Sequence, residues 1–185
     1  MGKLDKDTDN TQDSPYSFVV TLTLIGVTLI IGFITFISFQ DGYEVKKQQE
    51  VADYIHSAER IMNQSKAKTD EIIDGFNQNT LPNYGEIELE MFRALMTELN
   101  ELNAPKNWTE HKESVTNIVS QQYLFFYQYT HHLINLNEKN IEDFKTRDED
   151  YAQKEKNILT KGLDSSNIPY EVNDEGIIRF SIKTY

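Results

Sequence analysis

One uncharged hydrophobic run stands apart from the mixed hydrophobic and polar pattern of the rest of the chain. It covers residues 18–39, FVVTLTLIGVTLIIGFITFISF, which are 22 positions without a charge or a proline. A helix of this length measures about 33 Å, enough for a bilayer core of about 30 Å. The run is longer than the hydrophobic part of a usual signal peptide, and Gln40 is a poor residue at the cleavage position. We therefore expect an uncleaved, single-pass transmembrane helix at 18–39 in contact with membrane lipid, after a short polar tail at 1–17.

Four later segments show the periodicity of helices. The first carries a heptad pattern typical of coiled coils and bundles, with spacings that alternate between four and three residues. Asn, Pro and Gly crowd into 77–85 and predict a loop before a second helix at 86–103. Pro105 separates the second helix from a third, which Asn107 or Thr109 could cap. The stripe of the first segment consists of Val51, Ile55, Ala58, Met62, Ser65, Thr69, Ile72 and Phe76.

The next three segments differ in how much hydrophobic surface they offer. The third is expected to be the most buried helix, because Val119, Tyr123, Phe126 and Leu133 widen its stripe. The fourth, near 138–163, is thin and exposed, and it either continues the third helix or follows a break in the Asn-rich stretch 135–140. Gly162 is a plausible cap at its end. The hydrophobic side of the second helix is Ile87, Met91, Phe92, Leu95, Leu99 and Leu102, and that of the third is Trp108, His111, Val115, Ile118, Gln122, Phe125, Tyr129, His132 and Leu136.

The hydrophobic run has a stripe of its own, which is out of phase with the stripe of the first segment. Either the helix breaks near Asp41 and Gly42, or the two stripes face different partners. The stripe within the run consists of Thr21, Ile25, Thr28, Gly32, Thr35 and Phe39.

The C-terminus changes from helical to strand-like patterning. Residues 168–172 and 177–182 read as two strands around a turn at 173–176. Since a lone hairpin is marginal in water, it either packs on its own bundle or adds a strand to a partner's sheet. The residues that would form such a partner strand are Ile177, Ile178, Phe180 and Ile182.

The predicted architecture is therefore all-α. One N-terminal transmembrane helix leads into an antiparallel bundle of three or four helices at 41–163. A short C-terminal hairpin or flexible tail follows at 164–185.

The charge and cysteine content exclude several classes of function. From Asp41 onward the chain has 26 acidic and 16 basic residues, an excess of ten negative charges that disfavours nucleic acid. The absence of Cys excludes disulfides, thiolate metal sites and a cysteine nucleophile.

The histidines do not predict a metal site. His131 and His132 are adjacent on a helix and point about 100° apart. Asp53 and His56 share a face, but the sequence holds no Glu-x-x-His that would complete a di-iron bundle. We expect no metal, no cofactor and no enzymatic activity.

One short pattern is more specific. Leu99-x-x-Leu102-x-x-Pro105 ends one helix, and an aromatic residue and His111 open the next. This pattern resembles small helical-bundle proteins, membrane- or lipid-anchored, of the Gram-positive (Firmicute) cell surface. The resemblance covers about 86–136 and implies a helical fold and a cell-surface address, but no particular activity. From the residues themselves, Pro105 sets the turn, Trp108 staples the helix start, and His111 caps or hydrogen-bonds to the preceding turn.

The aromatic residues of the third segment indicate either a bundle core or a groove for an apolar ligand or partner helix. The leading hypothesis is a non-enzymatic, membrane-anchored interaction or scaffold protein with its C-terminal domain outside the cytoplasm, acting on a protein partner or by self-association. The alternative is an extracytoplasmic ligand-sensing domain that signals through a partner. The candidate ligand or partner surface is Trp108, His111, Tyr123, Phe126, Tyr129 and His132.

Overall fold

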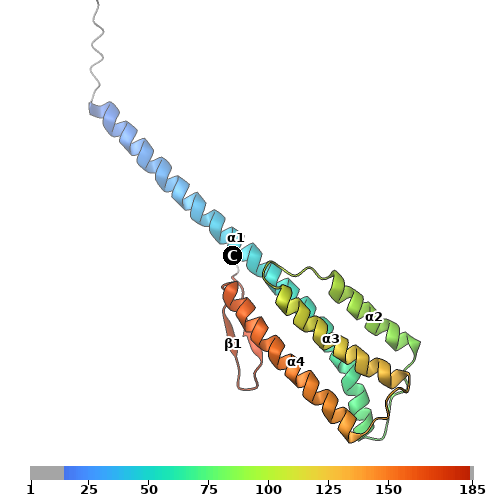
Figure 1. Cartoon of the computed structure of the whole chain (residues 1–185). Coiled ribbons are helices and arrows are strands. Elements are labelled where there is room, and N and C mark those ends of the chain that lie inside the picture. The colour runs from blue at the N-terminus through green and yellow to red at the C-terminus, as the bar shows by residue number, and fades with distance from the viewer. Residues whose placement is uncertain (1–14, 184–185) are drawn as a thin grey trace, which may run out of the picture. The chain divides into compact units, whose positions relative to one another are not determined.

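The computed structural model describes the backbone of residues 15–183 and the side chains of residues 27–183. Most of these residues are helical, which confirms the predicted class (Figure 1). The chain divides into two compact units at the boundary between Glu44 and Val45. The elements are α1 (Pro15–Asn77), α2 (Glu86–Glu101), α3 (Thr109–Thr130), α4 (Glu138–Ser165), β1 (Tyr170–Val172) and β2 (Ile178–Phe180).

The N-terminal unit contains the first part of α1. Its side chains from 27 to 39 include many large hydrophobic groups in the open, such as Phe33 and Phe39 at 66% and 76% exposure. Within the part of the chain that the structure describes, no helix is both long and hydrophobic enough to cross a membrane. The side chains of 18–26, where the predicted span begins, lie outside the described residues, as do residues 1–14 of the predicted tail.

Helix α1 continues without interruption through Asp41 and Gly42. The alternative of a helix break at this point is therefore wrong. The other alternative, in which the two out-of-phase stripes face different partners, stays a prediction.

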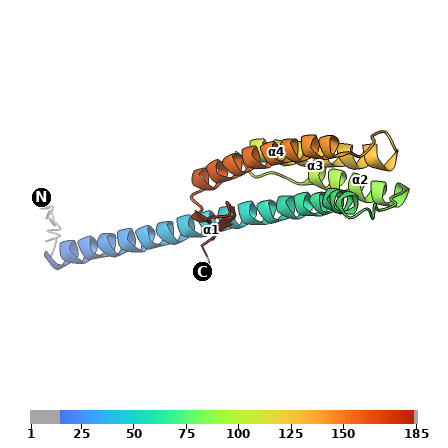
Figure 2. The same cartoon turned by 90° about the horizontal axis from the view of Figure 1, so that it is seen from below.

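The C-terminal unit, Val45–Tyr185, is a bundle of four helices, to which α1 contributes its residues from 45 to 77. Successive helices run in opposite directions and lie side by side (Figures 1 and 2). The core forms three clusters along the bundle. The hairpin-end cluster is Val51, Tyr54, Ile55, Trp108, Leu159, Leu163 and Ile168; the middle cluster is Ala58, Ile61, Leu99, Val115 and Val119; and the loop-end cluster is Ile72, Ile73, Leu89, Phe92, Phe125, Phe126, Ile141 and Phe144.

The heptad stripe of α1 faces this core as predicted. Six of its eight residues are buried, and Met62 and Phe76 are half-buried. In α3 the predicted stripe is buried from Trp108 to Phe125, whereas His132 lies beyond the helix and is exposed.

The prediction for α2 placed two residues on the wrong face. Ile87 and Met91 are 76% and 54% exposed, while Leu89 is fully buried together with Phe92 and Leu99. The helix is rotated so that Leu89 fills the loop-end cluster, which leaves Ile87 and Met91 outside the core.

The Asn-rich stretch is a genuine break between α3 and α4. Helix α3 ends at Thr130, and Asn137 caps α4 by accepting a hydrogen bond from the Asn140 amide at 2.9 Å. Helix α4 is less exposed than predicted, because Ile141, Phe144, Leu159 and Leu163 are buried in the core. At the start of α3, the expected side-chain cap is absent: Trp108 occupies the N-cap position without a capping side-chain bond.

Gly162 is not the cap of α4. It lies inside the helix against the Trp108 ring, where an added Cβ would come within 2.8 Å of that ring. The helix ends instead at Ser165, with Ser166 as its C-cap. Asn167 follows with a left-handed φ of 52°, and the Ile168 amide donates to the Leu163 carbonyl at 3.0 Å.

The C-terminal hairpin is present and packs on its own bundle. Its strands pair antiparallel, with Tyr170 opposite Phe180 and Val172 opposite Ile178. Ile178, Phe180 and Ile182 pack against the hairpin-end cluster, whereas Ile177 is 47% exposed.

Gln48 fastens this segment to α1. Its side-chain amide donates to the Asn167 carbonyl at 2.9 Å, and its amide oxygen accepts from the Lys183 backbone at 3.1 Å. Of the two alternatives for this segment, the structure therefore has the one in which the hairpin covers the bundle.

Candidate functional site

A hydrogen-bonded chain of three side chains crosses the interior of the bundle near the hairpin. His111 of α3 lies between Tyr54 of α1 and Glu155 of α4. Its Nδ1 is 2.9 Å from the Tyr54 hydroxyl oxygen and its Nε2 is 2.8 Å from Glu155 Oε1. His111 is 1% exposed and Glu155 is 7% exposed. We call these three residues the Tyr–His–Glu chain.

The hydrogen positions in this chain follow from its chemistry. A carboxylate only accepts, so a neutral imidazole carries its hydrogen on Nε2 and donates to Glu155. Nδ1 is then free to accept from the hydroxyl of Tyr54. Burial, and secondarily the charge of Glu155, raises the pKa of Tyr54 well above its usual value, which keeps this hydroxyl protonated.

Trp108 completes the surroundings of the Tyr–His–Glu chain. Its ring meets those of Tyr54 and His111 edge-on, with centroids 5.8 and 5.4 Å apart. Its indole Nε1 donates to Ser166 Oγ at 3.1 Å. The arrangement satisfies buried polar groups from three helices at one level, and therefore fixes their register.

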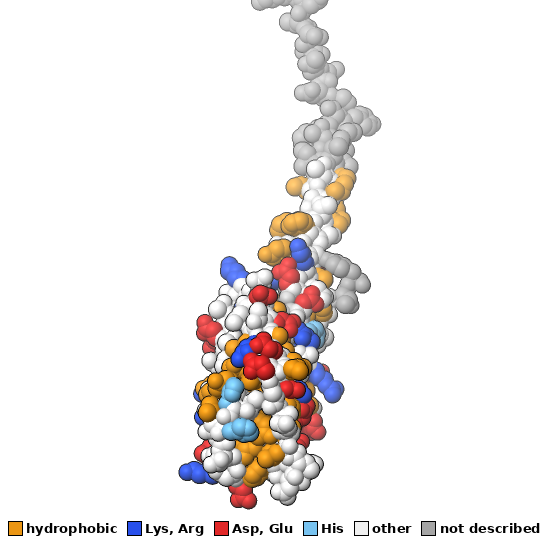
Figure 3. All heavy atoms as spheres, turned by 90° about the vertical axis from the view of Figure 1, so that its right-hand side faces the viewer, with side chains coloured by type: hydrophobic (Ala, Val, Ile, Leu, Met, Phe, Trp, Pro, Cys, Tyr) orange, Lys and Arg blue, Asp and Glu red, His pale blue; other side chains and the backbone are white. Residues whose placement is uncertain are grey.

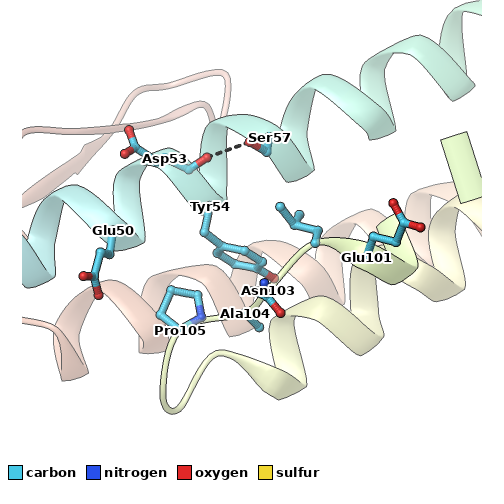
Figure 4. Close-up of a pocket in the computed structure, with 9 residues that line it drawn as sticks. Glu50, Asp53, Tyr54, Ser57, Glu101, Asn103, Ala104 and Pro105 are labelled. Carbon is cyan, nitrogen blue, oxygen red and sulfur yellow. Dashed lines mark hydrogen bonds between the residues drawn. The ribbon is translucent and has the colours of Figure 1, made fainter. Parts of the chain in front are cut away.

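An open hollow with acidic side chains in its lining adjoins this cluster. It has a volume of about 560 Å³ and lies between α1 and the α2–α3 loop, with Tyr54 as one wall (Figure 4). Glu50 and Asp53 come from α1 and Glu101 from the end of α2. Among the described residues, no group of three His, Asp or Glu side chains is placed to hold a metal ion. The three carboxylates make the hollow acidic, and Tyr54 is the member of the Tyr–His–Glu chain that lines it.

A second, more hydrophobic groove lies between α1 and α2. It has a volume of about 420 Å³. Two ion pairs lie beside it. Arg60 pairs with Glu98, and Lys68 Nζ lies 2.9 Å from Glu71 Oε1. On the side of the bundle where α2 lies, hydrophobic side chains reach the surface among charged ones (Figure 3). The groove is lined by Gln64, Ala67, Lys68, Met91, Phe92, Ala94 and Leu95, and we call it the α1–α2 groove.

The candidate surface residues from the sequence do not share one surface. Trp108 and His111 are buried at the hairpin end, and Phe126 is buried in the loop-end cluster. Tyr123 and Tyr129 are half-buried around that cluster, and His132 is exposed in the turn after α3. The structure thus separates these six residues into two distant parts of the core and one exposed turn.

Tyr129 belongs to the closure of the loop end. Its hydroxyl donates to the Pro82 carbonyl, and its ring lies edge-on to that of Tyr84 with centroids 6.3 Å apart. Tyr84 in turn donates to Glu71. Burial raises the pKa of both tyrosines above the usual value. These side chains bind the 77–85 loop to the bundle.

Sequence reasoning found His111 but missed its partners. Tyr54 and Glu155 are 57 and 44 residues away, and neither belongs to a predicted stripe. The available signal was His111 itself, a polar residue within the hydrophobic stripe of α3, which needs buried hydrogen-bond partners. The prediction that His111 bonds to the preceding turn is wrong, because its ring nitrogens face α1 and α4.

Comparison with known proteins adds no relative: no family model, curated protein or solved structure matches the chain. The resemblance to anchored helical-bundle proteins of the Gram-positive cell surface stays a prediction.

Proposed function

We propose that this protein is a non-enzymatic interaction protein anchored in the bacterial cell membrane, with the unit Val45–Tyr185 outside the cytoplasm. The observation that carries the proposal is the α1–α2 groove, an open and mostly hydrophobic surface on the outside of the bundle. Met91 and Ala94 on this groove are exposed although both side chains are hydrophobic. Such a surface is typical of a docking site.

Anchoring is supported by the hydrophobic run itself. Its 22 residues lack charges, and the side chains described from 27 onward are exposed and mostly hydrophobic. In water this exposure would be unfavourable, whereas in a lipid core it is favourable. A short tail inside and a long domain outside is the usual arrangement of such anchors.

The partner that fits the groove is an amphipathic helix with basic residues beside its hydrophobic stripe. Two neighbouring antiparallel helices, α1 and α2, bound the groove, so a third helix can pack along it. The excess of ten negative charges from Asp41 onward attracts a basic partner and repels an acidic one.

A designed peptide tests this proposal. A helical peptide with a leucine stripe and flanking lysines should bind the full chain in detergent, as measured by fluorescence anisotropy. Ala94→Lys places a charge in the groove and should weaken binding at least tenfold. Leu124→Lys, at a position on α3 that is 45% exposed, adds the same charge elsewhere and should change binding little.

A peptide with the same leucine stripe and flanking glutamates controls for charge. Equal binding of both peptides, or equal weakening by both lysine variants, would contradict a basic helix in this groove.

A second function, ligand sensing, is favoured by the hollow beside Tyr54. A small cationic ligand held by Glu50 and Asp53 would contact Tyr54, which connects to α3 and α4 through His111. Trp108, the single tryptophan, lies against Tyr54 and reports on this region. A titration with small amines that leaves Trp108 fluorescence and the melting temperature unchanged would rule this function out.

A further inference from the structure

A layer of polar side chains interrupts the hydrophobic core between the middle and loop-end clusters. Ser65 and Thr69 of α1, Gln122 of α3 and Asp148 of α4 are all buried. Gln122 Nε2 donates to Asp148 Oδ1 at 3.0 Å. The other oxygen of Asp148 lies 3.6 Å from Lys66 Nζ, the residue next to Ser65. These contacts join α3 to α4, and α4 to α1 at the residue beside Ser65.

Two atoms of this layer have no hydrogen-bond partner among the described residues. They are Ser65 Oγ and Gln122 Oε1, on side chains that are 0% and 1% exposed. Thr69, in contrast, donates to the Lys66 carbonyl at 2.8 Å. A buried polar atom without a partner costs free energy, and native interiors rarely contain one. Both atoms therefore call for a hydrogen-bond partner.

We propose that a single water molecule is bound in this layer, donating to Gln122 Oε1 and accepting the hydroxyl hydrogen of Ser65. Water matches both needs, because Gln122 Oε1 only accepts while the Ser65 hydroxyl can donate. A cation is disfavoured at this place, because Lys66 already neutralises Asp148. Buried waters of this kind typically make about three hydrogen bonds to otherwise unsatisfied groups. The bound water links α1 to α3 across the core.

The sign of one substitution tests the proposal on the full chain in detergent. If water is bound, Ser65→Ala removes one of its partners and lowers the melting temperature of the bundle by a few degrees. If the hydroxyl has no partner, the same change removes an unfavourable buried group, adds helix propensity, and raises the melting temperature. Ser57→Ala is the matched control, since it lies on the same helix and its hydroxyl donates to the Asp53 carbonyl at 2.8 Å. A melting temperature for Ser65→Ala above that of Ser57→Ala would overturn the proposal.

A second measurement observes the water directly and needs no variant. Nuclear Overhauser transfer from water to the Gln122 side-chain amide, in protein labelled with ¹⁵N-glutamine, should give a cross-peak of the sign expected for a long-lived bound water. Gln122→Met identifies that resonance by its loss. The absence of transfer at Gln122 would also overturn the proposal.

Discussion

At the scale of single residues, His111 shows how one polar side chain organises the hairpin end of the bundle. Both of its ring nitrogens are used, by Tyr54 from α1 and by Glu155 from α4. Since all three side chains are almost fully buried, losing one partner leaves another polar group without a hydrogen bond.

Tyr54→Phe removes only the hydroxyl and leaves His111 Nδ1 buried without a donor. We expect the free energy of unfolding to fall by about 1–3 kcal/mol, measured by urea denaturation followed by circular dichroism. Tyr43→Phe, at a tyrosine that is 67% exposed, is the control and should change stability by less than about 0.5 kcal/mol. Equal effects of the two variants would mean that the Tyr54 hydroxyl contributes nothing.

The contributions of Glu59 and Glu71 to the stability of the fold should change with pH in opposite directions. Burial raises the pKa of Glu59, an effect that His56 partly offsets and Glu155 increases, so the ionised form is disfavoured in the folded state. Glu59 therefore lowers stability as the pH rises from the usual carboxyl range through its raised pKa. Glu59→Gln should raise the melting temperature at pH 7 and leave it unchanged at a pH below the usual carboxyl range.

The pKa of Glu71 is shifted in the opposite direction from that of Glu59. The hydrogen bond from Tyr84, followed by that from Lys68, lowers the pKa of Glu71, so its charge stabilises the fold above the usual carboxyl pKa. This stability is lost as the pH falls through the lowered value, and Glu71→Gln should lower the melting temperature at pH 7. A pH series of melting curves for both variants checks the signs; a loss of stability at pH 7 in Glu59→Gln would contradict the first expectation.

At the scale of elements, periodicity predicted the helices well because their stripes must fill one core. The prediction of which α1 residues face the core was correct even at Ser65 and Thr69, which are polar yet buried. The face of α2 was harder to predict, because Ile87, Leu89 and Met91 are all hydrophobic and only the neighbouring helices decide which of them is buried. The role of Gly162 depended on Trp108, 54 positions earlier, and no local rule for helix ends reveals such a contact.

The hairpin is an element whose contribution to stability can be measured by a matched pair of substitutions. Ile168, just before β1, is 2% exposed in the hairpin-end cluster, whereas Ile177 in the turn is 47% exposed. Ile168→Ala should lower the free energy of unfolding by about 2–5 kcal/mol, because it opens a cavity in the core. Ile177→Ala should change it by less than about 0.5 kcal/mol. Denaturation curves that coincide for the two variants would show that packing of the chain at the start of the hairpin contributes nothing to the stability of the bundle.

At the scale of the whole molecule, the chain combines a hydrophobic N-terminal helix with a bundle that has its own core. The sequence predicted a hydrophobic helix at 18–39 ahead of a helical bundle, because the run lacks charge and the remainder mixes hydrophobic with polar residues at helical spacing. The candidate site was less predictable: the α1–α2 groove arises from the packing of two helices, and the partners of His111 come from helices distant in sequence. Long-range contacts of this kind leave no local periodic signal.

The full chain and the fragment without the N-terminal unit should go to different fractions when membranes are extracted at alkaline pH. We expect the full chain to stay in the membrane pellet after alkaline extraction, because a 22-residue uncharged helix is favourable in a lipid core. The fragment Val45–Tyr185 should remain in the supernatant with helical circular dichroism, since it contains all three core clusters.

The double variant Ile30→Lys, Phe33→Lys is the control within the full chain. Each lysine near the centre of a span costs about 2.5–3.5 kcal/mol, so this variant should move to the supernatant. Mass spectrometry of the purified wild-type N-terminus completes the test: a soluble chain that begins near Gln40 would show that 18–39 is a cleaved signal and not an anchor.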